Sequence, residues 1–130
     1  MTVDTLMTTA VISLHASDTV HRAREEMANA SIRHIPIVDG ANHVVGVISN
    51  RDLSRAPAER TALGQIMSTD VQTVRPGTPA HEAASLMLEL RIGSLPVVND
   101  EEELVGVITE TDFLQVARQA LEGAPLLQRS

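Results

Sequence analysis

The chain has 130 residues, 43% of them apolar but only 1% aromatic, so its core must be built from Val, Ile, Leu, Met and Ala. Ten basic residues, all Arg, stand against 17 acidic ones, and this net charge of −7 argues against a nucleic-acid-binding domain, which needs a basic face. The absence of cysteine excludes disulfides and thiol catalysis. Because no apolar run is long enough to span a bilayer and no secretory signal is visible, we expect a cytoplasmic protein without a membrane span.

The first half of the chain predicts strands and helices in alternation. Residues 11–14 are apolar and β-branched, which is typical of a strand. Asp18 is expected to cap a following helix, whose apolar residues recur at spacings of three and four. Two more strands are predicted at 35–38 and 44–48, with a turn at 39–42 between them. A second helix is expected to begin in residues 50–56.

The second half repeats this order. We expect Thr78 to cap the first helix of this half, with Pro79 at its first position, and Gly123 to end the last one. Residues 57–62 join the halves. The predicted elements are strand 71–74, helix 79–92, strands 95–98 and 104–108, and helix 111–122.

An internal duplication explains the repeated order. The segment 3–55 aligns with 63–115 without a gap, and 14 of the 53 pairs are identical. Chance at ordinary composition gives roughly three or four identities. We therefore predict two repeats, 1–60 and 61–130. The expected fold class is α/β (α+β layered): tandem duplicated βαββα units that pack about a pseudo-twofold axis, because one unit alone buries too little surface.

One motif occurs in both repeats after the third predicted strand. It reads glycine, two apolar residues, a hydroxyl residue, two variable residues and aspartate, at 46–52 and 106–112. The hydroxyl residue, Ser49 or Thr109, would begin a helix whose N–H groups attract anions. The aspartate, Asp52 or Asp112, could accept hydrogen bonds from a ribose diol. The alternative is that both pairs only cap helices.

With this motif and the proline-bearing strands IPIV and LPVV, the chain resembles the cystathionine-β-synthase (CBS) domain pair, or Bateman module, of the stand-alone prokaryotic type. The resemblance covers nearly all of residues 3–120. It implies a regulatory binding module, not an enzyme, that senses AMP, ADP, ATP or S-adenosylmethionine. It also implies a homodimer, and an effector protein that is regulated in trans.

The resemblance also implies which residues bind the ligand. Asp52 and Asp112 would bind the ribose, and Ser49 and Thr109 would contact phosphate or ribose. Members of this family usually build a pocket from both repeats, so the residues are not divided into two private sets. The full expected set is Ile12, Arg33, His34, Ile35, Pro36, Ser49, Arg51, Asp52, Gln72, Ser94, Leu95, Pro96, Thr109 and Asp112, with Gly93 beside them.

The two repeats differ at these positions, which predicts two unequal sites. Arg33 and His34 can neutralise phosphate, whereas the second repeat has Gly93 and Ser94 there and carries an acid, Glu110, inside its motif. We therefore expect the better phosphate site to use Arg33 and His34. Arg33→Ala should then weaken the binding of phosphorylated ligands more than the binding of adenosine.

Two other readings remain open. His21 and Glu25, four residues apart, could share a metal ion, although no complete ligand set is visible and we expect no metal. A ligand-free dimeric scaffold that binds another protein could use the acidic loop 99–103 and the C-terminal region with Leu126 and Leu127. A small adenosyl ligand would stabilise a sensor but not a scaffold.

Overall fold

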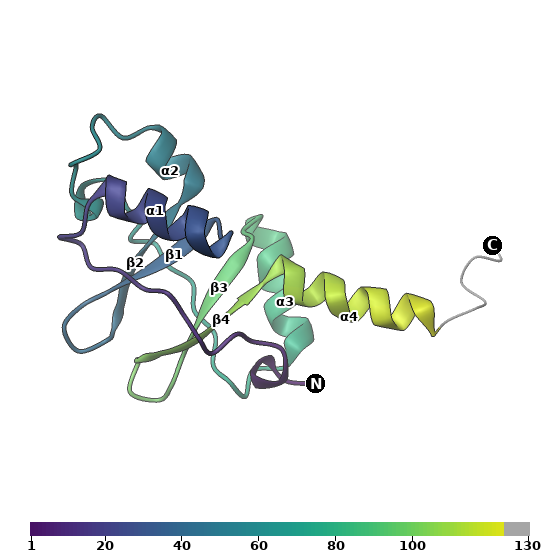
Figure 1. Ribbon diagram of the computed structural model, residues 1–130. Helices are drawn as coiled ribbons and strands as arrows, with labels where there is room; N and C mark the ends of the chain where they lie inside the picture. The colour runs from purple at the N-terminus through teal and green to yellow at the C-terminus, as the bar shows by residue number, and fades with distance from the viewer. Residues whose placement is uncertain (124–130) are drawn as a thin grey trace.

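The computed structural model describes residues 1–123 (Figure 1). Two short 3₁₀ turns, four helices and four strands follow one another in this part of the chain. Their order is η1 (Val3–Thr5), α1 (Val20–Ala30), β1 (His34–Val38), β2 (Val44–Ser49), α2 (Asn50–Ser54), η2 (Leu63–Gln65), α3 (Ala80–Leu90), β3 (Ser94–Val98), β4 (Leu104–Thr109) and α4 (Glu110–Glu122). None of these helices is long and apolar enough to cross a membrane.

Each repeat contains one antiparallel hairpin with the same register. Ile35 pairs with Ile48 in the β1–β2 hairpin, and Leu95 pairs with Ile108 in the β3–β4 hairpin. Both hairpins carry a bulge just before their last residue pair. The mixed α/β fold class and the tandem duplication are therefore confirmed.

Contacts between the repeats follow a pseudo-twofold axis. Thr8 bridges to Val107, and the equivalent residues Ser68 and Val47 form the reciprocal bridge. His43 bridges to Glu103, which occupies the same position of the other repeat, so the axis passes between these two residues. A contact between equivalent positions is the mark of a twofold arrangement.

Each hydrophobic core contains a segment from the other repeat. Val3, which has no exposed surface, packs in the core of the second repeat with residues of α3, β3 and β4. Leu63, also fully buried, packs in the core of the first repeat with residues of α1, β1 and β2. Figure 1 shows the purple N-terminal turn beside α3, where the amide of Val3 donates to the carbonyl of Thr78. The two repeats thus exchange their opening segments.

The predicted first strands, 11–14 and 71–74, are each reduced to one parallel bridge. Leu14 bridges to Ile37: its amide donates to the carbonyl of Pro36, and the amide of Val38 donates to the carbonyl of Leu14. The next bond of this ladder would need an N–H at Pro36, which proline lacks. The bridge of Val74 to Val97 stops at Pro96 for the same reason. The chain before Leu14 therefore leaves the sheet.

The predicted helix caps need partial correction. Thr19, not Asp18, caps α1, by accepting a bond from the amide of Arg22, while Asp18 accepts one from the amide of His15. Pro79 is itself the N-cap of α3, and Thr78 instead accepts a bond from the amide of Arg75. A tight turn precedes each of these helices. The side chains of Asp18 and Thr78 therefore accept from an amide of that turn and not from an amide of the helix. Gly123 ends α4, as predicted.

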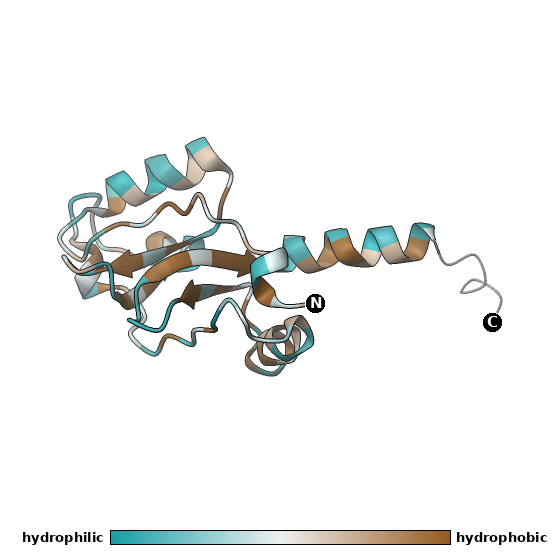
Figure 2. Cartoon of the chain, turned by 90° about the horizontal axis from the view of Figure 1, so that it is seen from below, coloured by the Kyte–Doolittle hydropathy of each residue, from teal (hydrophilic) through white to brown (hydrophobic). Residues whose placement is uncertain are grey.

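Helix α4 projects from the body of the molecule. It has 13 residues, none of which is buried. Figure 2 shows it extending away from the strands, with apolar and polar residues alternating along its length. Its first turn reaches the repeat interface, while the rest stands clear of both cores.

Candidate functional site

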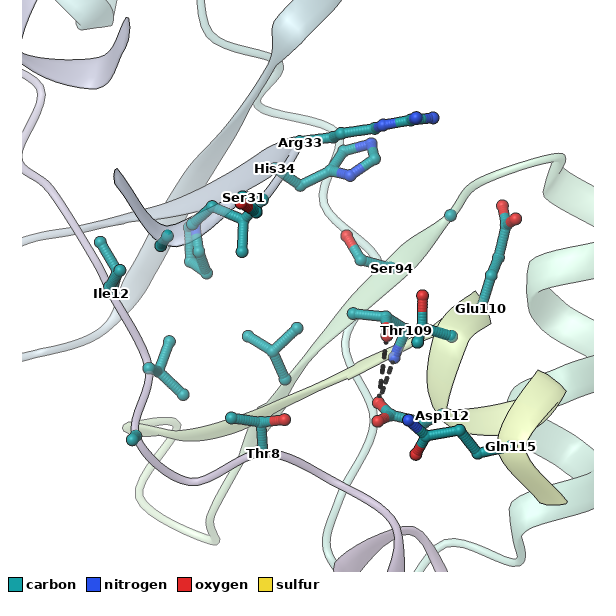
Figure 3. A pocket seen from close by; sticks show the side chains of 18 residues that line it. Thr8, Ile12, Ser31, Arg33, His34, Ser94, Thr109, Glu110, Asp112 and Gln115 are labelled. Carbon is teal, nitrogen blue, oxygen red and sulfur yellow. Dashed lines mark hydrogen bonds between the residues drawn. The ribbon is translucent and has the colours of Figure 1, made fainter. Parts of the chain in front are cut away.

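A cavity of about 890 Å³ lies between the two repeats. Four stretches surround it: the chain at 8–12, the end of α1 and start of β1, the start of β3, and the junction of β4 with α4. Figure 3 shows Ile12 at one end and Glu110 at the other. The lining residues are Thr8, Ala10, Val11, Ile12, Ala30, Ser31, Ile32, Arg33, His34, Pro36, Gly93, Ser94, Val107, Thr109, Glu110, Thr111, Asp112 and Gln115.

The cavity brings together half of the residues expected to bind a ligand, and it takes them from both repeats. The first repeat supplies Ile12, Arg33, His34 and Pro36, and the second supplies Ser94, Thr109 and Asp112. The phosphate-binding candidates therefore lie in the same cavity as the ribose-binding candidate of the other repeat.

Asp112 is fixed by the cap of α4. Its Oδ2 accepts bonds from the Thr109 amide at 2.8 Å and the Thr109 hydroxyl at 3.2 Å (dashed lines in Figure 3). Together with the bond from the Asp112 amide back to the Thr109 side chain, this is a capping box. Both described bonds to the carboxylate end on Oδ2, which leaves Oδ1 able to accept from a ligand. Capping and ligand binding are compatible here.

Ser49 and Asp52 form the same capping box at α2. Asp52 Oδ2 accepts bonds from the Ser49 amide at 2.8 Å and the Ser49 hydroxyl at 2.9 Å. Neither residue lines the cavity between the repeats. Both motifs therefore cap helices, and only the second motif faces this cavity.

His34 lies between charged groups of both repeats. Burial lowers the pKa of its imidazole below the ordinary value. The carboxylates of Glu110 and Asp52 oppose this shift, and the Arg33 guanidinium adds to it. The net effect favours a neutral ring at neutral pH.

Gly93 makes room for two of these side chains. A Cβ atom at this position would lie 2.9 Å from Glu110 Oε1 and 3.4 Å from His34 Cε1. The Glu110 amide also donates to the Gly93 carbonyl at 3.0 Å. The start of α4 is thus anchored over Gly93, with the Glu110 carboxylate beside the His34 ring.

The remaining expected residues lie elsewhere. Ile35 and Leu95 are fully buried in the two cores, and Pro96 pairs with Val107 in the β3–β4 hairpin. Arg51 and Gln72 are exposed. Their roles in ligand binding, like those of Ser49 and Asp52, stay predictions.

Sequence reasoning missed several lining residues. Thr8 reaches the cavity because its segment crosses to β4 of the other repeat, where its amide donates to the Val107 carbonyl. Gln115 lies three residues after Asp112, a helical spacing that could have indicated a shared face. Glu110 differs between the motifs, and the sequence alone associates it with the weaker site. The structure places it with Arg33 and His34 instead.

No group of three potential metal-ligating side chains occurs within residues 1–123. His21 Nε2 and Glu25 Oε1 lie 3.5 Å apart on α1, and both side chains are exposed. They form a close contact between two exposed side chains.

Comparison with protein families gives two matches along the chain. The family model described as CBS domain matches residues 3–59 and again residues 63–118. An inosine-5′-monophosphate dehydrogenase of Methanocaldococcus jannaschii is 34% identical over 105 residues, which cover 81% of this chain and 21% of the dehydrogenase. A CBS domain-containing protein of Dictyostelium discoideum is 28% identical over 135 residues, which cover 92% of this chain and 93% of that protein. The chain thus spans about a fifth of the matched enzyme.

Solved structures show the same fold. A protein of Vibrio cholerae described as a putative acetoin utilization protein (AcuB) has a TM-score of 0.86 and 37% identity, covering 94% of this chain and 95% of that one. The CBS domain pair of protein MJ0100, in complex with 5′-methylthioadenosine and S-adenosylmethionine, has a TM-score of 0.86 and 26% identity, covering 92% and 98%.

Two further structures hold nucleotides. CBSX2 in complex with AMP has a TM-score of 0.83 and 27% identity, covering 92% of this chain and 97% of that one. The cytosolic domain of the Mg²⁺ channel MgtE in complex with ATP has a TM-score of 0.80 and 34% identity, covering 88% and 48%. Since the family model matches both halves in tandem and these structures share the fold, the chain belongs to the CBS domain family, as a tandem pair of CBS domains.

Proposed function

We propose that this CBS pair is a non-catalytic regulatory module that binds an adenine nucleotide or another adenosyl ligand in the cavity between its repeats. The observation that carries the proposal is the meeting of Asp112, fixed by its cap, with Arg33 and His34 of the other repeat in one cavity. The related structures with S-adenosylmethionine, 5′-methylthioadenosine, AMP and ATP support this ligand class.

The arrangement of the cavity suits the three parts of an adenosyl ligand. Apolar side chains gather around Ile12 and offer walls for a flat base. Asp112 Oδ1 can accept from the ribose hydroxyls near the middle. Arg33, His34 and Glu110 would then face the 5′ substituent at the far end.

The experiment compares two aspartates with the same structural role. Asp112→Ala and Asp52→Ala each remove a capping box, at a cost of about 1 kcal/mol of folding stability. Only Asp112 lines the cavity. In calorimetric titrations with adenosine, AMP, ADP, ATP, S-adenosylmethionine and 5′-methylthioadenosine, Asp112→Ala should weaken the best ligand at least about tenfold, which corresponds to about 1.4 kcal/mol. Asp52→Ala removes the same kind of cap outside the cavity and should weaken that ligand much less.

Thermal melting offers an independent readout. A ligand at 100 times its dissociation constant stabilises the folded state by about 2.7 kcal/mol. Equal loss of binding in the two variants would contradict the assignment of this cavity. Failure of every adenosyl ligand to bind the unmodified chain would favour the protein-binding scaffold.

We also propose that the chain forms a homodimer through α3 and α4. Leu88 and Leu114 are 80% and 67% exposed, and a groove of about 530 Å³ separates their helices. Arg91 and Glu110 both border this groove, so the surface carries both signs of charge and can pair with a second copy of itself about a twofold axis. The equivalents of Leu88 and Leu114 in the first repeat are Ala28 and Ser54, and this difference supports an interface in the second repeat.

Light scattering after gel filtration tests this interface. The unmodified chain should have twice the chain mass of 14.0 kDa. Leu114→Glu should give a monomer, whereas Ser54→Glu, at the equivalent position, should remain a dimer. A monomeric unmodified chain, or a dimer that survives Leu114→Glu, would contradict the proposal.

Regulation in trans and a cytoplasmic location remain predictions that accompany this function, as do the repeat boundaries at 1–60 and 61–130. The scaffold alternative would use the acidic turn between β3 and β4. Arg75 already binds this turn, through the Asn99 carbonyl and the Glu102 carboxylate. Leu126 and Leu127 lie outside the described residues.

A further inference from the structure

The far end of the cavity, opposite Ile12, contains charges of both signs (Figure 3). Arg33 lies directly before β1 and is exposed. Glu110 stands in the first turn of α4 on the facing side, with its carboxylate over Gly93. The acid of the second motif therefore opposes the cation that we expected to attract phosphate.

The charged groups of the lining do not favour a polyanion. Arg33 is positive, whereas Glu110 and Asp112 are both negative. His34 contributes little positive charge at neutral pH, because burial lowers its pKa. A 5′-polyphosphate would bring several negative charges next to Glu110, and like charges at short range repel.

This acidic character belongs to one cavity and not to the motif in general. The residue equivalent to Glu110 in the first repeat is Asn50, and the residue equivalent to Gly93 is Arg33. Gly93 leaves the space that the Glu110 carboxylate fills beside His34. Because the cavity lies between the repeats, the acid of the second motif meets the basic segment of the first repeat.

We propose that the cavity prefers an adenosyl ligand with a neutral or cationic 5′ substituent, a thioether or a sulfonium that bears an ammonium group, over a 5′-phosphorylated one, and that Glu110 sets this preference. The inference rests on the proposed adenosyl-binding function. Glu110 would attract a cationic tail, would tolerate a neutral one and would repel phosphate.

The experiment uses two matched acids in the full chain. Glu110→Gln removes the cavity charge. Glu82→Gln removes the first-turn acid of α3, which lies at a similar position relative to its helix but does not line the cavity. Both variants change the net charge equally and both remove a favourable interaction with a helix N-terminus. Each protein is titrated with 5′-methylthioadenosine, S-adenosylmethionine, AMP and ATP at one salt concentration.

The unmodified chain should bind 5′-methylthioadenosine and S-adenosylmethionine more tightly than AMP and ATP. Glu110→Gln should strengthen the binding of ATP and AMP roughly 2–5-fold and weaken the binding of S-adenosylmethionine by a similar factor, as expected for one exposed charge. Binding of the uncharged 5′-methylthioadenosine should change by less than about twofold. Glu82→Gln should leave all four affinities unchanged.

Three results would overturn the preference. The first is that the unmodified chain binds ATP more tightly than both thioadenosyl ligands. The second is that the two Gln variants have identical affinities. The third is that Glu110→Gln loses affinity equally for all four ligands, which would indicate a structural role for Glu110. None of these affects the proposed function. That function fails only if no adenosyl ligand binds the unmodified chain.

Discussion

Two glycines determine how closely the repeats approach. A Cβ atom at Gly106 would lie 2.7 Å from the sulfur of Met7 and 3.1 Å from the carbonyl oxygen of Thr8. At Gly46 it would lie 2.6 Å from the sulfur of Met67 and 3.0 Å from the carbonyl oxygen of Ser68. The methionine sulfurs can move, but the backbone carbonyls are held by bridges to β4 and β2.

Gly106→Ala and Gly46→Ala should therefore each destabilise the protein by about 1–3 kcal/mol, the usual cost of overpacking. Only Gly106→Ala should also weaken ligand binding, because only Thr8 lines the cavity. Urea denaturation and titration measure the two effects. Gly40→Ala is the control: nothing lies within 4 Å of its Cβ position, so stability should change by less than about 0.5 kcal/mol. Equal ligand affinities of Gly106→Ala and Gly46→Ala would refute the idea that crowding at Gly106 disturbs the cavity through Thr8.

The partly buried imidazole of His34 makes stability depend on pH. Burial lowers its pKa below 6.5, so the unfolded chain takes up this proton at a higher pH than the folded chain does. The stability contributed by the neutral ring is thus present above the unfolded pKa and is lost as the pH falls toward the folded pKa. When the pH is lowered from about 7.5 to about 5.5, the melting temperature of His34→Gln should fall less than that of the unmodified chain.

Exposed His21, replaced in His21→Gln, is the control for this pH experiment, and that variant should follow the unmodified chain. If the melting temperature of His34→Gln has the same pH dependence as that of the unmodified chain, burial of this ring does not contribute to the loss of stability at low pH.

At the scale of elements, a proline in the first hairpin ends strand pairing beside the cavity. Pro36 lacks the N–H that would bond the carbonyl of Ile12, so the parallel ladder ends at Leu14. The chain then turns away from β1, and Ile12 borders the cavity. Val11 and Ile12 can border the cavity because they do not pair with β1.

Pro36→Ala restores that donor. We expect residues 12–14 to pair further along β1, with slow hydrogen exchange of the new amide at position 36 and a loss of ligand affinity of about tenfold or more as the cavity narrows. Pro96→Ala makes the same change at residues 72–74, which do not line this cavity, and should reduce affinity much less than Pro36→Ala does. Rapid exchange at position 36 would show that the segment stays apart for another reason.

At the scale of the whole molecule, the exchanged segments make each repeat depend on the other. Val3 completes the core of the second repeat and Leu63 that of the first, and both are fully buried. Neither half can bury its apolar surface with its own residues alone. The protein should therefore unfold as one unit.

Leu63→Ala should cost about 2–5 kcal/mol, the range for a buried leucine, and yet leave a single transition in calorimetry. Val3→Ala should act in the same way with a smaller loss, since fewer methyl groups are removed. Exposed Leu121 gives the control, because Leu121→Ala should have little effect on stability. Two resolved transitions in either core variant would mean that the repeats fold separately.

The sequence by itself determined the features that depend on local patterns. The gapless alignment of 3–55 with 63–115 revealed the duplication, and the apolar spacing predicted α1 and α3. The Ser49–Asp52 and Thr109–Asp112 pairs indicated two capping boxes. These features depend on residue types and spacings that can be read directly along the chain.

Only the tertiary structure decided which residues share a cavity. The crossing of the opening segments brings Thr8 to β4, and the pseudo-twofold axis sets Glu110 beside His34, although the two belong to different repeats and lie far apart in the chain. The sequence pattern treats both repeats alike, whereas the charge of a site depends on which motif faces which segment. That pairing follows from packing across the axis, which no local spacing encodes.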